Sequence, residues 1–393
     1  MLNATIHAHS DTAFRRLIGR FLAFYAERLA TPQWSDIVTI GRNNRLNISM
    51  GCLGLDQAQA EAIWQPFFAW VAGAGDDYSF IQPVRVFAGP ARQRWDPDFL
   101  RSRFSSAVQT DDRPGAPRDN IYWTANVAEA GHYIFGYESV WLPAALLAAD
   151  RHDALADALF ATSRIWPMEL HFQKALAGAP PEAIAATRDT VINPAVLDAF
   201  VLVIIGSEGA PAYPGLPGYS PDLANARHDA SEVVKAMAEL RKVVPEPGSY
   251  LAETSYFESD WQKSFWGSNY PRLRQIKNKY DPQGLFFVHH GVAPQQSLPL
   301  PGRGSPGRVE SYAQCLAILS ARASSKKGHA AGRELPKACR AVERISSDSV
   351  GSPTARASVI APTTPARVVI ARRRRAAAVP LHRPASSSNA VRR

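Results

Sequence analysis

The chain has 393 residues, with 44 Lys and Arg against 35 Asp and Glu and a formal net charge of +9. The charge is unevenly distributed: residues 294–393 carry 18 basic and 4 acidic residues (+14), which leaves 26 against 31 (−5) for residues 1–293. All nine Trp fall in residues 1–293, so we expect this part to fold around a sizeable core. The Arg-, Ala-, Pro- and Ser-rich remainder is expected to be disordered.

Several classes of protein are excluded. Only Cys52 lies in the expected folded part, while Cys315 and Cys339 lie beyond it, which excludes a disulfide within the core and a metal-thiolate cluster. No apolar run approaches the roughly 18 residues of a membrane span, so we expect a cytoplasmic protein without a membrane partner. The arginine run 372–375 could attract phosphates, but no aromatic residue interleaves after Tyr312, and no nucleic-acid partner is expected.

The sequence of the first 90 residues predicts a helix, a β-hairpin, a second helix and a strand. Apolar positions recur every 3.6 residues from Phe14 to Leu29, which predicts an amphipathic helix capped by Ser10 or Asp11 and ending near Pro32. Asn43 and Asn44 tolerate the backbone of a tight turn. The predicted elements are a hairpin of residues 37–40 and 46–53, a helix over 57–71 interrupted by Pro66, and a strand over 80–87.

The middle of the chain mixes helices and strands without strict alternation. Residues 111–120 (DDRPGAPRDN) have the Pro, Gly and Asp content of a long surface loop. Helices are predicted over 143–160, 181–188 and 222–244, and strands over 169–175, 200–206 and 249–255. This order predicts an α+β fold, with a mainly antiparallel sheet backed by helices.

Residues 257–292 combine an aromatic-rich helix start, an Asp-Pro turn and a run that predicts a buried strand. This segment resembles the C-terminal part of berberine-bridge-enzyme-like FAD-linked oxidoreductases, in the vanillyl-alcohol oxidase and p-cresol methylhydroxylase superfamily. The residues that carry the resemblance are Trp261, Trp266, Gly267, Asn269, Tyr270, Leu273, Lys277, Tyr280, Asp281, Pro282, Phe286, His289 and His290.

The resemblance implies a substrate-binding domain over residues 1–248, a C-terminal helix-strand segment over 249–293 and a tail over 294–393. It also implies that FAD is held mainly by another domain that this chain lacks, since no Gly-rich phosphate loop occurs in residues 1–293. The complete enzyme would oxidise a small alcohol or amine by hydride transfer to flavin, with oxygen as acceptor, and the chain alone would be inactive. The alternative is a non-catalytic ligand-binding or interaction fragment that pairs with a separately encoded FAD-binding domain.

The resemblance also points to a catalytic base. Family members commonly carry Tyr-x-Asn-Tyr on a strand just before the aromatic segment, and here that stretch reads Tyr250-Leu251-Ala252-Glu253. Glu253 therefore occupies the position of the catalytic Tyr, and a desolvated carboxylate can act as a base. Alternatively, Glu253 is an edge-strand residue that faces water and has no catalytic role. Tyr250 and Tyr256 are then the alternative phenols that could act as the base.

Further candidates concern the cofactor and the substrate. Resemblance places Asn269 and Tyr270 near the isoalloxazine ring, and a helix-capping Asn with a packed Tyr is the structural alternative. His171 and Gln173 should share one face of a predicted strand and Lys174 the other, which indicates a pocket wall. His289 and His290 should point in opposite directions on an extended segment, so no metal site is predicted.

Overall fold

The computed structural model describes residues 1–127, 129–213, 215–244 and 248–292. The disorder expected for residues 294–393 concerns a region outside these ranges. Within them, no helix has both the length and the apolar character needed to cross a membrane.

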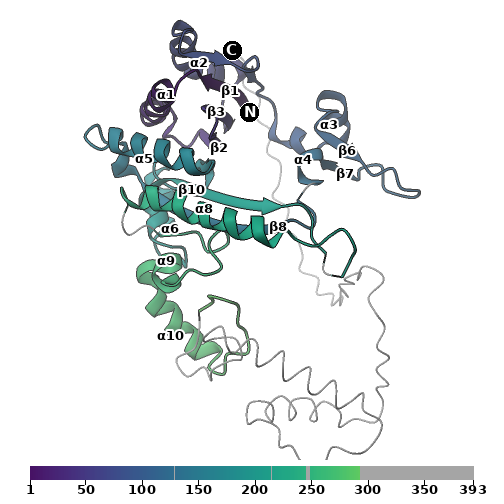
Figure 1. Ribbon diagram of the computed structural model, residues 1–393, viewed down its shortest axis with the longest axis vertical. Coiled ribbons are helices and arrows are strands. Elements are labelled where there is room, and N and C mark those ends of the chain that lie inside the picture. Colours follow the sequence, from purple (N-terminus) through teal and green to yellow (C-terminus); the bar gives the residue numbers. More distant parts are fainter. Residues whose placement is uncertain (128, 214, 245–247, 293–393) are drawn as a thin grey trace, which may run out of the picture. The chain divides into compact units, whose positions relative to one another are not determined.

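An eight-stranded sheet organises this part of the chain (Figure 1). Its order is β4-β1-β3-β2-β9-β10-β8, with β5 also paired to β1, and every pairing is antiparallel. The strands are β1 (Leu2–Ala8), β2 (Trp34–Ile40), β3 (Arg45–Cys52), β4 (Tyr78–Phe80), β5 (Arg85–Val86), β8 (Tyr133–Pro143), β9 (Met168–His171) and β10 (Ala199–Gly209). The predicted α+β class with a mainly antiparallel sheet is confirmed.

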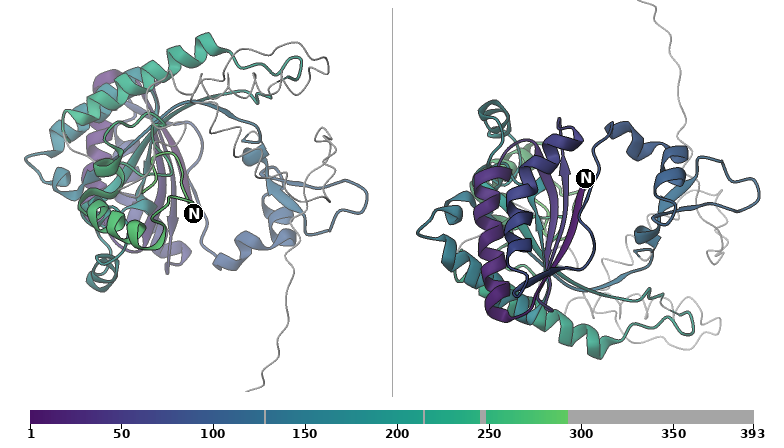
Figure 2. Two further views of the ribbon diagram at one scale, coloured as in Figure 1. Left: turned by 90° about the horizontal axis from the view of Figure 1, so that it is seen from below. Right: turned by 90° about the horizontal axis from the view of Figure 1, so that it is seen from above.

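Helices cover one face of this sheet (Figure 2). The α-helices are α1 (Asp11–Phe24), α2 (Gln57–Gly73), α3 (Pro97–Arg103), α4 (Thr124–Val127), α5 (His152–Ile165), α6 (Pro181–Thr187), α7 (Ala195–Asp198), α8 (Leu223–Arg241), α9 (Trp261–Trp266) and α10 (Tyr270–Tyr280). A π-helix, η1 (Tyr25–Leu29), extends α1, and 3₁₀ turns lie at η2 (Ala91–Trp95), η3 (Ala144–Leu147), η4 (Phe172–Lys174) and η5 (Gly267–Asn269).

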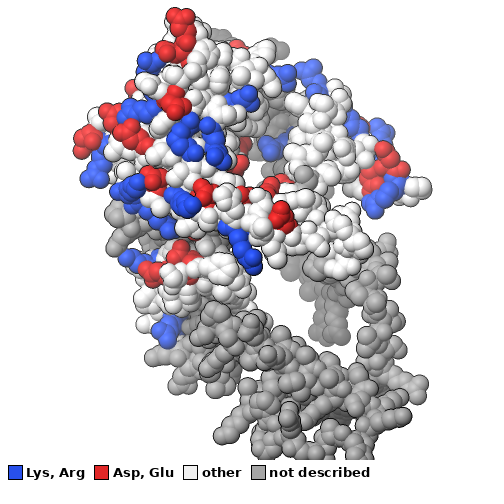
Figure 3. All heavy atoms as spheres, viewed as in Figure 1, with Lys and Arg blue, Asp and Glu red and all other residues white. Residues whose placement is uncertain are grey.

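The core lies between the sheet and four of these helices, α1, α2, α5 and α8. Alternate residues of β1, such as Leu2 and Ile6, are fully buried beneath them. Aromatic rings of α1 and α2 interlock: Phe24 stacks on Phe67 at 5.1 Å and lies 5.0 Å from Trp64. Charged side chains of both signs intersperse over the outer surface of α5 and α8 (Figure 3). The helices therefore bury one face of the sheet and present a solvated surface.

The opposite face of the sheet carries polar side chains at alternate positions of β1, β3, β2 and β9, whereas its β10–β8 end carries a smaller apolar cluster that includes Trp141, Leu202 and Ile204. Thr39 of β2 is in register with Asn47 of β3 on one side and with Glu169 of β9 on the other. Asn47 is in turn opposite Thr5 of β1. We call this surface, on which none of α1, α2, α5 and α8 packs, the helix-free face, although the four-residue α7 contacts its β10–β8 end through Val196. The candidate site lies on this face.

The early elements follow the sequence closely. Ser10 caps α1 by accepting a hydrogen bond from the amide of Ala13 at 3.1 Å. Asn44, in the hairpin turn, has the left-handed φ of 58° that the two asparagines indicated. Pro66 does not interrupt α2, which starts with a capping box at Asp56 and runs through to Gly73.

Two predicted elements differ from the structure, and strand β1 was not predicted. Residues 80–87 form two short strands, β4 and β5, around Pro83 instead of one, because proline cannot donate to a sheet ladder. Residues 143–160 do not form one helix: Pro143 ends strand β8 opposite Ala199, residues 144–147 form the 3₁₀ turn η3, and the α-helix begins only at His152. Strand β1 was missed, although Leu2, Ala4, Ile6 and Ala8 alternate with polar residues.

The predicted strand over 249–255 is wrong. The amide of Glu253 donates to the carbonyl of Tyr250, which closes a turn, and the Ser249 hydroxyl donates to Thr254 Oγ1 at 2.7 Å. The amide of Tyr250 donates to the hydroxyl of Ser139 instead of a strand carbonyl. The hydroxyl groups of short polar side chains thus form hydrogen bonds with backbone amides that a β-strand would use to pair with a neighbouring strand.

The buried strand predicted after Pro282 is also wrong. Residues 285–288 have no partner strand in the described ranges, and their exposed fractions run from 62% to 75%. The described chain therefore leaves a row of apolar side chains in solvent.

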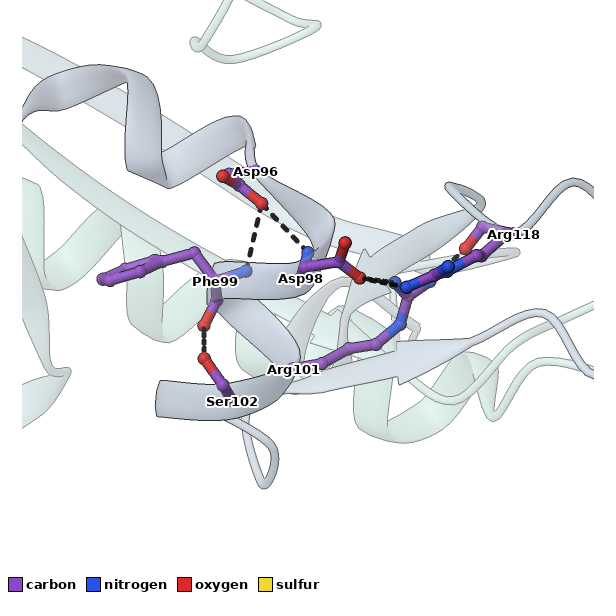
Figure 4. Close-up of polar contacts among 6 residues, drawn as sticks. All are labelled: Asp96, Asp98, Phe99, Arg101, Ser102 and Arg118. Carbon is purple, nitrogen blue, oxygen red and sulfur yellow. Dashed lines mark hydrogen bonds and ion pairs between the residues drawn. The ribbon is translucent and has the colours of Figure 1, made fainter.

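Residues 87–132 form an excursion between β5 and β8. The expected loop 111–120 connects its two strands, β6 (Val108–Thr110) and β7 (Ile121–Trp123). In Figure 4, Asp96 accepts bonds from the first amides of α3, and Asp98 pairs with Arg101 and Arg118. These contacts join α3 to the end of the 111–120 loop.

The aromatic core makes one stability prediction. Trp64→Ala should lower the free energy of unfolding by about 3–5 kcal/mol, because a fully buried indole leaves a cavity that the packed rings around it cannot fill. The matched control is Trp95→Ala, whose side chain is 76% exposed and whose loss should cost about 0.5 kcal/mol or less. Urea unfolding followed by circular dichroism measures both, and equal losses would contradict this account of the core.

Candidate functional site

Five of the seven predicted site residues lie close to one another on the helix-free face. They come from the end of β9, from η4, and from the turn at residues 249–254. Lys174 Nζ lies 2.7 Å from Glu253 Oε2 and 4.7 Å from the centre of the Tyr250 ring. Segments separated by about 80 positions in sequence therefore meet through one lysine.

The sheet holds the turn at residues 249–254 in place. Trp141 of β8 donates its amide to the carbonyl of Gly248, and its ring meets Tyr250 edge-on at 6.2 Å. Ser139 and Ser249 are both buried, and their hydroxyl oxygens lie 2.8 Å apart. Because Ser139 also accepts from the Tyr250 amide at 3.1 Å, the turn is fixed at both its backbone and its side chains.

His171 is the centre of a second set of contacts. Its Nε2 lies 2.9 Å from Glu169 Oε2, and Gln173 Nε2 lies 3.2 Å from its Nδ1. With Gln173 donating to Nδ1, the ring carries its proton on Nε2 and donates it to the carboxylate. The predicted strand over 169–175 is wrong beyond His171, where β9 ends, and Gln173 contacts His171 from the 3₁₀ turn η4. Because the strand ends there, Lys174 does not take the opposite face but reaches Glu253 in the same cluster. The pocket wall stays a prediction.

Sequence reasoning missed Glu169 and Tyr137. Tyr137 lies on β8 opposite Gly206 of β10, and a Cβ at Gly206 would come within 3.0 Å of the phenol ring. The glycine therefore gives the ring room to lie over β10. The alternation of Tyr137, Ser139 and Trp141 along β8 was the available signal, but no strand was predicted there, because the predicted helix began just after it at Pro143.

Burial and charge both act on Tyr137. Desolvation, then the carboxylates of Glu253, Glu169 and Glu208, raise the pKa of its phenol to about 12. The phenol is therefore neutral at physiological pH and available as a hydrogen-bond donor.

The two carboxylates of the cluster have different surroundings. Glu253 Oε2 is buried, and its contact is the ammonium group of Lys174, in an ion pair whose side chains are 25% and 30% exposed. Glu169 is 50% exposed, and its Oε1 has no hydrogen-bond partner among the described residues. The carboxylate of Glu169 is thus the more accessible acceptor.

Asn269 and Tyr270 lie apart from this cluster. Asn269 Nδ2 donates to the backbone carbonyls of Thr190 at 3.2 Å and Ile192 at 2.8 Å, and it makes no side-chain cap for α10. Tyr270 packs edge-on against Trp261 at 5.5 Å. Their contact with a flavin ring stays a prediction.

The two histidines do not point in opposite directions as expected. His290 has a φ of 58°, which breaks the extended backbone, and the two imidazole rings lie 3.8 Å apart. His289 stacks on Tyr256 at 3.9 Å, and its Nε2 lies 2.7 Å from the Tyr256 carbonyl. These contacts hold the end of the aromatic segment against the turn that follows Thr254.

Residues 249–293 match the family described as Berberine and berberine like. An uncharacterized FAD-linked oxidoreductase of Arthroderma benhamiae is 48% identical over 67 residues, which are 17% of this chain and 12% of that protein. The FAD-linked oxidoreductase cheF of Chaetomium globosum is 32% identical over 115 residues, 29% of this chain and 17% of that protein. The resemblance to berberine-bridge-enzyme-like FAD-linked oxidoreductases is confirmed.

The fold of the VAO-type flavoprotein MtVAO615 from Myceliophthora thermophila C1 is also similar, with a TM-score of 0.50 and 19% identity. That alignment covers 74% of this chain and 47% of the solved chain. The chain thus spans about half the length of this flavoprotein, and its alignments cover less than a fifth of the two curated relatives. FAD use is a property of this family.

The surroundings of Tyr137 give a pH prediction. Between pH 10, the ordinary tyrosine pKa, and about 12, the folded protein holds this proton more tightly than the unfolded chain. The free energy of unfolding should therefore fall as pH rises through this window, and Tyr137→Phe should reduce the fall.

Urea unfolding at several pH values between 9 and 12 measures this difference. Nuclear magnetic resonance of labelled tyrosine in a Glu253→Gln variant provides the second arm, because removing that charge should lower the pKa of Tyr137. Identical pH slopes for the Tyr137→Phe and unmodified chains would contradict the assignment.

Proposed function

We propose that this chain supplies the substrate-facing part of an FAD-dependent oxidoreductase that oxidises a small alcohol or amine, with molecular oxygen as final acceptor. The observation that carries the proposal is the polar cluster on the helix-free face, which lies beside a segment of the berberine-like family. The whole enzyme would include a flavin-binding domain, and this chain alone would be inactive.

The described residues fit a flavin in part. Residues 285–288 with Phe257 offer exposed apolar surface of the kind that packs against a flat ring or a second domain. The dinucleotide phosphates call for backbone amides in a Gly-rich turn, which residues 1–293 do not contain. The chain would therefore contact the isoalloxazine ring of the flavin, and a partner domain would bind the phosphates.

Oxidation of an alcohol removes a proton from oxygen and a hydride from the adjoining carbon. Bound FAD would accept the hydride, that is, the hydrogen with its electron pair. The part that this chain's residues perform is to bind the hydroxyl group and take its proton.

We assign the proton transfer to Glu169. Its Oε2 is oriented by the Nε2–H of His171, while Oε1 is available to a substrate hydroxyl. Glu253, the residue at the family's base position, is neutralised by Lys174 and its Oε2 is buried. The Oε2 atom of Glu253 is occupied by Lys174, whereas Oε1 of Glu169 has no protein partner in the described ranges and can meet a substrate hydroxyl.

Tyr137 would position the same hydroxyl group. Its neutral phenol can donate a hydrogen bond to the substrate oxygen, and both Glu169 and Glu253 act electrostatically on it. Donor and acceptor would then hold one oxygen from two sides, which fixes the geometry for proton removal.

The assignment predicts a specific loss of activity. In the enzyme assembled with its flavin-binding domain, Glu169→Gln should lower kcat/KM by about 10²–10⁴-fold, because the amide cannot accept the proton. Glu253→Gln should lower the melting temperature, with a loss of kcat/KM smaller than about tenfold.

The matched control is Glu232→Gln, a partly exposed glutamate on α8 that, like Glu253, is paired with a lysine, Lys235. Steady-state kinetics and thermal unfolding distinguish the three variants. A larger kinetic loss for Glu253→Gln than for Glu169→Gln would reverse the roles of the two carboxylates.

The proposed division of the flavin site makes another prediction. The full chain, purified after mixing with FAD and gel filtration, should show no stoichiometric flavin absorbance, since its own residues contact only part of the cofactor. A stoichiometric yellow complex would contradict the proposed need for a second domain.

The runner-up function is a non-catalytic module that binds a ligand or pairs with a separately encoded flavin domain. The exposed apolar side chains of residues 285–288 favour a docking role. Oxidation of a small alcohol by the assembled enzyme would exclude this reading. A stable complex that binds the same alcohols without turnover would favour it.

A further inference from the structure

A pocket with no assigned role lies at the β1–β5 edge of the helix-free face. Its volume is about 280 Å³, and it is lined by Asn3, Ala4, Thr5, Gln82, Pro83 and Arg85. Arg85 is in register with Asn3, so the guanidinium and the amide come from neighbouring strands. No acidic residue lines the pocket.

The pocket is remote from Glu169. Between β9 and β1 lie β2 and β3, so three inter-strand spacings of about 4.8 Å separate the strands, or roughly 14 Å. The pocket therefore stands apart from the proton-transfer cluster, and its chemistry does not depend on the proposed function.

The guanidinium group of Arg85 has no protein partner in the described ranges. It makes no ion pair or side-chain hydrogen bond with any described residue, whereas eight others pair with carboxylates. Those eight are Arg15, Arg16, Arg101, Arg113, Arg118, Arg164, Arg241 and Arg272. Its five donors are thus available to a ligand.

The side chains beside Arg85 complement it. Asn3 and Gln82 each carry an amide with two donor hydrogens, and Thr5 carries a hydroxyl. Guanidinium groups bind the two oxygens of a carboxylate or phosphate through parallel hydrogen bonds, and neutral donors nearby complete the shell of the anion. A cation in this setting would meet only the positive charge of Arg85.

We infer that this pocket binds the oxyanion group, carboxylate or phosphate, of a small ligand, with Arg85 as the charged anchor and Asn3, Thr5 and Gln82 as neutral donors. The ligand can be a separate metabolite or the acidic end of an extended substrate. Both share the chemistry that the pocket recognises.

The test measures binding to the full chain at low ionic strength, where exposed charges are least screened. Benzoate and succinate probe carboxylates, and inorganic phosphate probes the alternative oxyanion. Calorimetry should show saturable binding of at least one probe with Kd below about 10 mM. The probe that binds more tightly identifies the oxyanion.

Three variants make the result specific. Arg85→Gln should weaken binding at least about tenfold, and Arg85→Lys should weaken it less, because lysine keeps the charge without the planar fork. The control is Arg28→Gln, an exposed arginine of η1 outside the pocket that likewise has no partner among described residues.

The variants distinguish a loss of binding from a loss of folding. Arg85 is exposed on a two-residue edge strand, so its variants should unfold at the urea concentration of the unmodified chain. Absence of saturable binding, or an equal loss in Arg28→Gln, would overturn the inference and leave the proposed oxidoreductase function untouched. Failure of the assembled enzyme to oxidise alcohols would not affect this pocket.

Discussion

The structure depends on the one-sided burial of its sheet. Strands β1 and β3 alternate, as β2 does from Val38 to Ile40, so they place apolar residues under the helices and polar residues on the helix-free face. A shift of one residue in any register would exchange the two sets, so the hydrophobic core fixes the position of the polar side chains. The candidate site therefore gains its rigidity from packing that it does not itself contain.

A second constraint joins the berberine-like segment to that sheet. The backbone bond from Trp141 to Gly248, the paired hydroxyls of Ser139 and Ser249, and the ion pair of Lys174 with Glu253 all cross between the two parts. The hydroxyl contacts are buried, where an unmatched partner would cost about 1–3 kcal/mol. Tyr250 and Glu253 consequently have defined positions although they lie in a turn.

Sequence periodicity was sufficient for elements whose apolar pattern is unambiguous. It located α1, α8, β10 and the β2–β3 hairpin, and the resemblance identified the family from residues 257–292 alone. It failed for strand β8, which was not predicted: its residues lie just before the predicted helix start at Pro143, and pairing with β10 defines the strand. Lys174 and Glu253 were each singled out, but their pairing arises from tertiary contacts that no local pattern records.

On the helix-free face, the proposed role of each carboxylate depends more on the side chain that it contacts than on its own residue type. Glu169 and Glu253 are the same side chain, and both influence Tyr137, yet one contacts a neutral imidazole and the other an ammonium group. An imidazole that donates from Nε2 orients a carboxylate without cancelling its charge, whereas a lysine compensates that charge and ties the carboxylate to the turn. Position in a family motif predicts that a carboxylate is present near the reacting group. Under the proposed function, the residue that each carboxylate touches sets its role, because Glu253 Oε2 is held by Lys174 while Glu169 Oε1 stays open to a ligand.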